Sequence, residues 1–422
     1  MKYLLSLTFL FFTCLAFAMP SKVEMQQNGG QWLLTVNGAP YYVKGVGGSV
    51  QLDEAVACGA NTIRTWGLEN AKNILDEAES KGLKVMMGIW MAHERHGFNY
   101  SDEWAVKDQL NAVRKAVEEL KDHPALLMWG VGNEVDLFYS DLNVWTATEN
   151  LAAMIQEVDP NHPTCCVTAG IDVAEVQLIK EVAPSIDILG VNTYGGITNL
   201  RHQIDLYGWE KPYMVTEWGP TGHWEVAKTT WGAPIEDSST EKARDYAERY
   251  EKGISLDAEQ CIGSFVFLWG QKQETTPTWY GVFLESGYKT GAIDVLYRAW
   301  NGKDPATSAP EIEVLTINDQ DKRSSVKIEA NSSNELHLIF TDADNDVKRI
   351  HWEVLPESND IKAGGDVEKR PETLSGLVNF NENGGEYGSI KAPSTSGAYR
   401  LFVYIEDNDN KVATTNIPFW VD

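Results

Sequence analysis

Cysteine is scarce in this chain, with 5 among 422 residues. One lies in the apolar N-terminal stretch, and the other four are dispersed, at Cys58, Cys165, Cys166 and Cys261. So few cysteines in so long a chain exclude a disulfide framework of the kind that stabilises small secreted domains. Cys165 and Cys166 are neighbours on a predicted strand and face opposite sides, and their spacing fits no metal site. We expect all four to be buried as small apolar residues.

Basic residues are also in deficit. The chain has 35 Lys and Arg against 61 Asp and Glu, a formal net charge of −26. This imbalance excludes a general electrostatic attraction to nucleic acid or to anionic lipid, and it favours a neutral or cationic partner. The hydrophobic fraction of 43% is ordinary for a globular protein that buries a large core.

Long apolar runs are confined to the start of the chain. Residues 1–18 contain Lys2, an apolar run and then Ala16-Phe17-Ala18, which fits the small-residue rule for signal cleavage. We therefore expect residues 1–18 to be a cleavable signal peptide and the protein to be secreted or periplasmic. No later segment is long enough and free enough of charge to span a membrane.

Tryptophan, by contrast, is abundant, with 15 residues beside 16 Tyr and 13 Phe. Large flat rings fill protein cores, but they also stack against the C–H faces of sugars. The position of these rings relative to a site decides between the two interpretations.

Residues 19–302 alternate between strand-like and helix-like segments. After a β-hairpin with its turn at Asn37-Gly38, eight apolar runs are predicted as strands: 42–46, 61–66, 84–91, 125–132, 164–169, 187–194, 213–217 and 262–269. Segments with helical spacing lie between them, at 69–81, 104–121, 144–158, 174–182 and 240–256. The pattern predicts an α/β fold, a (β/α)₈ TIM barrel. A doubly wound open sheet alternates in the same way, but no Gly-rich phosphate turn follows the first strand.

The pattern changes after residue 302. Residues 301–310 form a polar stretch with Gly, Pro and Ser, and residues 303–310 are predicted as a linker. Residues 311–422 contain short alternating strands, at 336–340, 347–354, 398–405 and 413–421, and predict an immunoglobulin-like β-sandwich. We expect this domain to pack or to act as a spacer. Its acidic turns, 342–346 and 406–410, lack the complete spacing of a calcium loop and are interpreted as solvated turns.

Active sites of barrels form where the strands end at their carboxyl ends. Aromatic, amide, basic and acidic residues converge there in this sequence: Arg64 and Trp66, Trp90 and His93, Asn133 and Glu134, Asn192 and Tyr194, Glu217 and Trp218, and Trp269. Two Glu residues across a pocket are what cleavage of a glycosidic bond requires, one as a protonated acid and one as an anion. The anion disfavours ionisation of its neighbour and so keeps the acid protonated.

Two runs of residues resemble the paired motifs of clan A retaining glycoside hydrolases. These are Trp129-Gly130-Val131-Gly132-Asn133-Glu134 at the fourth strand and Val215-Thr216-Glu217-Trp218-Gly219 at the seventh. The segments 33–38, 61–65 and 123–125 are similar to the barrel domain of family 2, while Asn133-Glu134-Val135 and Asn192-Thr193-Tyr194 resemble β-1,3-glucanases and glucanosyltransferases of the clan. The resemblance covers roughly Trp32–Trp300. The leading β-sandwich domains of family 2 lie outside it, so that family's substrate range is not carried over.

The resemblance implies a role for each matching residue. Glu134 would be the acid/base and Glu217 the nucleophile. Asn133 would bind the sugar 2-hydroxyl, Arg64 would keep the nucleophile ionised, Tyr194 would orient it, and Trp269 would form the floor beneath the reacting sugar. Substrate contacts are also predicted for Trp90, Asn192 and His93, and for Trp224 and Trp279 as walls of further sugar subsites.

These observations predict a secreted retaining β-glycoside hydrolase that acts on an oligo- or polysaccharide, which we expect to be a β-glucan. We expect no cofactor, no metal site, no nucleic-acid partner and a monomer, with the Glu134 and Glu217 carboxyls about 5 to 5.5 Å apart. One alternative is a transglycosylase that uses the same two glutamates. An alternative from another class is a non-catalytic carbohydrate-binding protein, against which the intact pair of glutamates counts.

Overall fold

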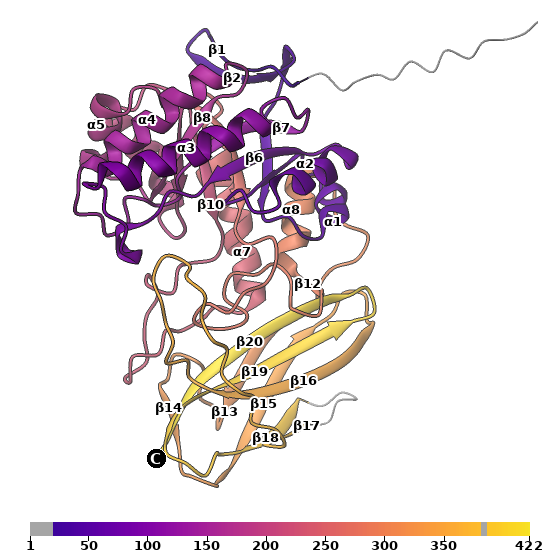
Figure 1. The fold of residues 1–422 in the computed structure, drawn as a ribbon. Coiled ribbons are helices and arrows are strands. Elements are labelled where there is room, and N and C mark those ends of the chain that lie inside the picture. The colour runs from indigo at the N-terminus through magenta and orange to yellow at the C-terminus, as the bar shows by residue number, and fades with distance from the viewer. Residues whose placement is uncertain (1–19, 381–385) are drawn as a thin grey trace, which may run out of the picture.

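The structure is a computed structural model that describes residues 20–380 and 386–422. The predicted signal peptide, residues 1–18, lies outside the described residues. Figure 1 shows a mixed helix and strand domain at the top and an all-strand domain below it, with α7 and α8 pointing toward the junction.

Eight parallel strands close a barrel, which confirms the predicted fold of the first domain. In barrel order they are β4 (Val43–Gly47), β5 (Thr62–Arg64), β6 (Lys84–Ile89), β7 (Leu126–Val131), β8 (Thr164–Ala169), β9 (Ile188–Asn192), β10 (Tyr213–Trp218) and β11 (Cys261–Val266). These strands are apolar along almost their whole length because both of their faces are covered. Each predicted strand coincides with one of them.

Helices surround the barrel: α1 (Leu52–Cys58), α2 (Ala71–Ser80), α3 (Glu103–Leu120), α4 (Asn143–Val158), α5 (Val173–Val182), α6 (Leu200–Tyr207), α7 (Ser239–Arg249) and α8 (Gly291–Asn301). Short turns of other helix types lie at η1 (Glu94–His96), η2 (Ile197–Asn199) and η3 (Tyr250–Ser255). The predicted helix at 240–256 is α7 followed by the π-helical turns of η3. The main core lies between strands and helices, and Cys58, Cys165, Cys166 and Cys261 are buried free thiols as expected.

A small antiparallel sheet covers the amino-terminal end of the barrel. It contains β1 (Val23–Asn28), β2 (Gln31–Val36) and β3 (Ala39–Pro40). Asn37 and Gly38 join β2 to β3 with φ of 53° and 81°, the left-handed pair that a type I′ hairpin turn requires. Leu34 packs with Met86 and Phe265 inside the barrel and so closes that end.

Two β-sheets form the second domain. One contains β12 (Lys289–Thr290), β20 (Lys411–Val421), β19 (Gly397–Asp407) and β16 (Val347–Pro356), with β14 (Val326–Ile328) beside β20. The other contains β13 (Glu311–Ile317), β15 (Ser333–Thr341), β18 (Tyr387–Lys391) and β17 (Val378–Phe380). Apolar side chains from both sheets form one core. The four predicted strands are present, while the immunoglobulin-like topology stays a prediction.

The two domains are joined by more than the connecting chain. Residues 289–290, which precede α8 of the barrel, pair in parallel with Lys411 and Val412 and so extend the sheet of the second domain. In the stretch 303–310, predicted as a linker, the Ala309 N–H donates to Asp294 at 2.8 Å, and Lys411 contacts the same carboxylate at 2.6 Å. Barrel and sandwich therefore share a sheet and a buried ion pair.

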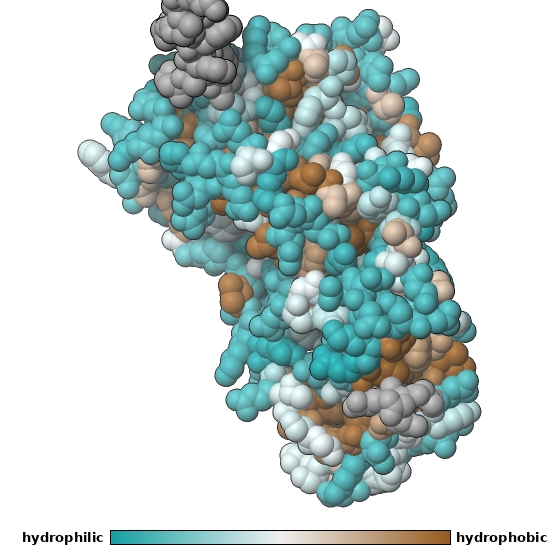
Figure 2. Space-filling view, turned by 90° about the vertical axis from the view of Figure 1, so that its right-hand side faces the viewer, coloured by the Kyte–Doolittle hydropathy of each residue, from teal (hydrophilic) through white to brown (hydrophobic). Residues whose placement is uncertain are grey.

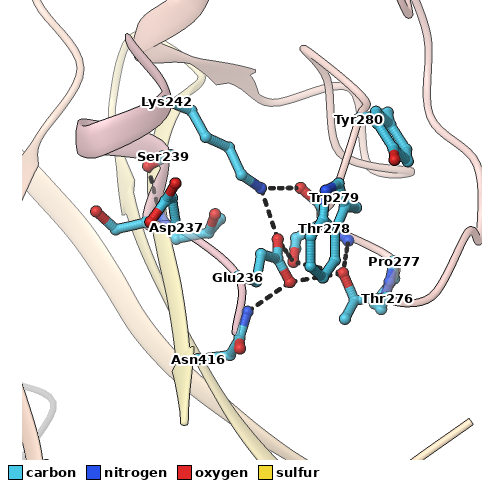
Figure 3. Close-up of polar contacts among 12 residues, drawn as sticks. Glu236, Asp237, Ser239, Lys242, Thr276, Pro277, Thr278, Trp279, Tyr280 and Asn416 are labelled. Atoms are coloured by element: carbon cyan, nitrogen blue, oxygen red, sulfur yellow. Dashed lines mark hydrogen bonds and ion pairs between the residues drawn. The ribbon is translucent and has the colours of Figure 1, made fainter. Parts of the chain in front are cut away.

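A buried carboxylate, Glu236, also links the domains (Figure 3). Its Oε1 accepts hydrogen bonds from Lys242 at 2.6 Å and Thr278 at 2.8 Å, and its Oε2 accepts from Thr276 and from Asn416 of β20, both at 2.6 Å. Burial acts to raise the pKa of Glu236, but the charge of Lys242 and the hydrogen bonds outweigh it and lower that pKa. The carboxylate thus holds the connection after β11 against the second domain.

The molecular surface is predominantly hydrophilic over both domains (Figure 2). Within residues 20–380 and 386–422, no helix combines the length and apolar character needed to cross a bilayer.

We predict that Glu236→Ala lowers the free energy of unfolding by about 3 kcal/mol, because it leaves the Lys242 ammonium buried without its partner. The measurement is equilibrium unfolding in denaturant, followed by tryptophan fluorescence. Glu248→Ala is the matched control, since Glu248 pairs with Lys252 on the exposed face of α7 and the adjoining turns. Equal effects of the two substitutions would contradict the assigned role of Glu236.

Candidate active site

A cavity of about 890 Å³ opens where the barrel strands end at their carboxyl ends. The structure brings seven of the predicted site residues together on its lining: Trp90, Asn133, Glu134, Asn192, Tyr194, Glu217 and Trp224. Arg64 lies directly beneath and contacts Glu217. The cavity thus collects carboxylate, amide and aromatic groups from β6, β7, β9, β10 and the connections that follow them.

Glu134 is positioned by a tight turn at the end of β7. Gly132 and Glu134 have φ of 72° and 52°, and the Glu134 N–H donates to the Val167 carbonyl of β8 at 2.9 Å. A Cβ atom at position 132 would lie 3.0 Å from the Val135 side chain, so the turn favours glycine. A left-handed backbone is uncommon for a residue with a Cβ, and the strain at Glu134 is typical of functional sites.

Glu217 lies on β10 and is surrounded by hydrogen-bond donors. Its Oε1 accepts from Arg64 Nη1 at 3.0 Å and from Trp66 Nε1 at 2.7 Å, and its Oε2 accepts from the Tyr194 hydroxyl at 3.0 Å. Burial raises the pKa of Tyr194 well above its usual range, which keeps this hydroxyl a donor. Three donors, one of them a cation, therefore fix the orientation of the Glu217 carboxyl group.

Arg64 is buried and fully engaged. Besides Glu217 it donates to the Thr216 carbonyl at 2.6 Å and to Asn133 Oδ1 at 2.7 Å. Asn192 connects the two glutamates, because its Nδ2 donates to Glu134 Oε1 at 2.8 Å while its Oδ1 accepts from Thr216 Oγ1 at 2.8 Å. One hydrogen-bonded network therefore fixes both carboxyl groups.

The surroundings of Glu134 favour its protonated form. Burial above all, and next the negative charge of Glu217, raise the pKa of Glu134 to about 8, although the hydrogen bond from Asn192 acts in the opposite direction. At neutral pH Glu134 therefore carries a proton. A pair of carboxyl groups in unequal protonation states is suited to acid/base and nucleophilic chemistry on one bond.

His93 does not reach the cavity, contrary to the prediction. Its buried ring stacks on Trp90, with the ring centroids 4.7 Å apart, and its Nδ1 accepts from Arg95 Nε at 3.2 Å. Burial, with the charge of Arg95, lowers the pKa of His93 to about 4, so the ring is neutral. His93 thus supports Trp90, and Trp90 is the residue exposed to the cavity.

Trp269 and Trp279 also lie away from the cavity, so the predicted floor and wall are wrong for these two residues. Both are buried: Trp269 packs edge-on against Phe283, and Trp279 donates from Nε1 to the Thr221 carbonyl at 2.9 Å. The sequence pattern extended the last strand to residue 269, whereas β11 ends at Val266. Phe267 is therefore the aromatic residue from this strand end that lines the cavity.

Two further features of the cavity were absent from the predicted set. Trp66, predicted to lie at the strand ends but given no role, lines it and donates to Glu217. Residues 361–366 of the second domain line it as well. No pattern in the sequence indicated that this domain reaches the strand ends of the barrel.

Metal binding has no evident place in the described ranges. Among residues 20–380 and 386–422, no three His, Cys, Asp or Glu side chains are grouped in a way that could hold a metal ion.

Part of this barrel is similar to domains of carbohydrate-active enzymes. Residues 63–225 match the model of the TIM barrel domain of glycosyl hydrolases family 2. The β-glucuronidase of Paenibacillus borealis is 27% identical over 224 residues, which cover 44% of this chain and 36% of that protein. The β-glucuronidase of Felis catus is 24% identical over 202 residues, covering 46% of this chain and 29% of that protein. These matches show what the central part of the barrel is similar to, a glycoside hydrolase barrel domain.

Solved structures agree on the fold. The β-D-glucuronidase of Dictyoglomus thermophilum superposes with a TM-score of 0.51 at 19% identity, covering 67% of this chain and 54% of that one. The β-glucuronidase of Bacteroides uniformis superposes with a TM-score of 0.52 at 14% identity. The match covers 95% of this chain and 48% of that one. The chain spans only about a third of the length of the curated relatives, 36% and 29% for the two proteins above. A relationship to β-1,3-glucan enzymes stays a prediction.

We predict that Glu217→Gln lowers the pKa of Glu134 by about one unit or more, because the substitution removes a like charge next to it. The measurement is an NMR titration of protein labelled with ¹³C at the glutamate carboxyl groups. Glu225→Gln is the control: Glu225 also lines the cavity, but its carboxylate accepts backbone hydrogen bonds from Gly195 and Gly222. An unchanged or higher pKa in Glu217→Gln would contradict the coupling.

Proposed function

We propose that this protein is a retaining β-glycoside hydrolase that cleaves a neutral β-linked glycan, a β-glucan, through a covalent glycosyl intermediate. The observation that carries the proposal is the pair formed by Glu134, whose pKa is raised, and Glu217, which accepts hydrogen bonds from Arg64, Trp66 and Tyr194, in one cavity. The family 2 match supports glycosidase chemistry at these strand ends. The predicted separation of about 5 to 5.5 Å between the two carboxyls belongs to the proposal.

In the first step, Glu217 attacks the anomeric carbon while Glu134 gives its proton to the departing oxygen. Arg64 and Trp66 anchor Oε1 of Glu217, so we assign the attack to Oε2, which accepts from Tyr194. The bond from Glu217 to the sugar forms as the glycosidic bond breaks. Protonation by Glu134 leaves the aglycone as a neutral alcohol.

In the second step, Glu134 is a carboxylate and takes a proton from water, whose oxygen attacks the anomeric carbon and releases Glu217. The configuration at that carbon is thereby retained. A sugar hydroxyl in place of water would give a longer glycan by transglycosylation. Products longer than the input oligosaccharide distinguish this alternative from hydrolysis.

Asn133 is suited to the sugar 2-hydroxyl. Its Oδ1 is occupied by Arg64, and the planar amide therefore directs its NH₂ group to the other side. A hydrogen bond at the 2-hydroxyl strengthens in the oxocarbenium-like transition state. Trp90, 40% exposed, and Trp224, 57% exposed, present ring surface on which sugars can stack.

The charge of the cavity favours a neutral sugar. Besides the protonated Glu134, four carboxyl groups line it, those of Glu217, Glu225, Glu274 and Asp366, against the two lysines Lys272 and Lys362. Both lysines have partners: Lys272 pairs with Glu274 at 2.8 Å, and Lys362 donates to the Val367 carbonyl. An additional carboxylate on the substrate would therefore be repelled. Export of the protein, proposed from residues 1–18, is consistent with a polymeric substrate outside the cell.

A β-glucuronide is the second candidate substrate. The relatives named above are β-glucuronidases, and Lys272 is a cation on the cavity lining that could turn toward a uronate if it left Glu274. A β-glucuronide would require Lys272 to give up its ion pair with Glu274 and to form one with the substrate carboxylate.

We predict that kcat/KM for 4-nitrophenyl β-D-glucoside exceeds that for 4-nitrophenyl β-D-glucuronide by at least about tenfold, with matched leaving groups. Glu217→Gln serves as the inactive control for both assays. A higher kcat/KM for the glucuronide would contradict the neutral substrate and favour a β-glucuronide. Absence of turnover on both glycosides and on a panel of β-1,2-, β-1,3-, β-1,4- and β-1,6-glucans would overturn the hydrolase proposal.

A further inference from the structure

One connection of the second domain lies against the barrel at the cavity. Residues 357–377 join β16 to β17, and Figure 1 shows this long connection leaving the lower domain and rising beside the barrel. Its residues 361–366, called here the wall segment, line the same cavity as Glu134 and Glu217. The candidate site is therefore built by both domains.

Three basic side chains of the barrel hold the wall segment. Arg95 Nη1 donates to the Ala363 carbonyl at 3.0 Å and lies 3.4 Å from the Asp366 carboxylate. His96 Nε2 contacts the same carboxylate at 2.9 Å, and Lys272 Nζ donates to the Gly365 carbonyl at 2.8 Å. Arg95 and His96 follow β6 and Lys272 follows β11, so the segment is anchored at two separate places on the barrel.

The backbone of the wall segment at these anchors favours glycine. Gly364 and Gly365 have φ of 63° and 70°, in the left-handed region. A Cβ atom on Gly364 would lie 2.5 Å from Arg95 Nη1, and one on Gly365 would lie 3.2 Å from Lys272 Nζ. The two glycines allow the carbonyl groups to approach both cations closely.

A buried carboxylate fixes the base of the same connection. Glu368 accepts from the Lys362 N–H at 2.9 Å on one oxygen and from the Thr275 N–H at 2.6 Å on the other. Thr275 belongs to the connection after β11, which Glu236 also ties to the second domain through Thr276 and Thr278. The wall segment is thus an ordered part of the site.

The wall segment bridges the side of the barrel that contains β4 and β5. The connections after β4 and β5 are short, residues 48–51 and 65–70, whereas those after β10 and β11 span 219–238 and 267–290. The anchors of the wall segment follow β6 and β11, the strands that flank β4 and β5 in the barrel. The segment therefore stands above β4 and β5, across the barrel from β8 and β9.

We propose that the wall segment forms a sugar-binding subsite beside the reacting sugar, so that the second domain determines how a glycan chain is held. This inference rests on the proposed function and extends it. The subsite offers backbone polar groups and small or apolar side chains, Ile361 and Ala363, to a neutral sugar ring. Arg95 is a positioning residue, because it acts through the segment that it holds.

The test compares two substrates in the full-length protein. One is 4-nitrophenyl β-D-glucoside, which has a single sugar, and the other is the β-glucan oligosaccharide that the wild-type protein cleaves fastest. In Arg95→Ala and in Asp366→Asn, we expect the ratio of kcat/KM for the oligosaccharide to that for the single sugar to fall at least about tenfold, mainly through KM. Arg114→Ala, which removes an exposed pair with Glu157 on the outer helices, should leave the ratio unchanged.

Equal losses on both substrates, or no change in the ratio in either variant, would overturn the subsite. If the wild-type protein cleaves no glycoside, the proposed function fails, and the subsite is then judged by binding. Each β-glucan oligosaccharide of the panel is titrated into Glu217→Gln with and without Arg95→Ala, followed by tryptophan fluorescence. A Kd about tenfold or more weaker in the double variant supports the subsite. Equal Kd values, or no binding by either protein, overturn it.

Discussion

The buried contact between Arg64 and Glu217 organises the candidate site. A guanidinium and a carboxylate removed from water are stable only when their remaining hydrogen-bonding groups have partners. The Thr216 carbonyl and Asn133 provide partners for the cation, and Trp66 and Tyr194 provide them for the anion. Residues from four strand ends must therefore meet at one point, and a closed parallel barrel is a fold that brings them there.

The protonation of Glu134 depends on the same contact. Burial, and next the negative charge of Glu217, raise the pKa of Glu134, so that Glu134 can act as an acid at neutral pH. The left-handed turn at Gly132 and Glu134 places this acid at the rim, and Asn192 links it back to the network. The barrel fold, the strained turn and the electrostatic interactions therefore all bear on Glu134 and Glu217.

The second domain is attached to the barrel next to the candidate site. The sheet shared through β12 and β20, the buried Glu236 cluster and the Glu368 bridge all join the sandwich to the connection after β11. That connection and the wall segment bound one side of the cavity. The role expected from the sequence, packing or spacing, described only part of what the domain does, because its short strands carry no motif and the contacts that matter are made by a loop.

Most of the barrel could be predicted from the sequence, because buried parallel strands leave apolar runs and Asn133-Glu134 and Glu217 lie at strand ends in recognisable motifs. The helices α1, α6 and α8 were missed, and α1 and α6 span only 52–58 and 200–207. Aromatic residues were harder to place. Trp269 and Phe267 are two positions apart on one strand end, and only the exact end of β11 decides which of them faces the cavity. Long-range contacts such as Arg95 with Asp366 leave no trace in local sequence pattern.

The covalent bond from Glu217 to the sugar is the central claim, and it can be observed directly. The protein is incubated with 2-deoxy-2-fluoro-β-D-glucosyl fluoride, which slows the release of such an intermediate, and its peptides are mapped by mass spectrometry. We expect one fluoroglucosyl group on the peptide that contains Glu217, and none in Glu217→Gln. A protein that hydrolyses β-glucosides but is labelled at another carboxylate, or gives the inverted anomer without labelling, would contradict the mechanism.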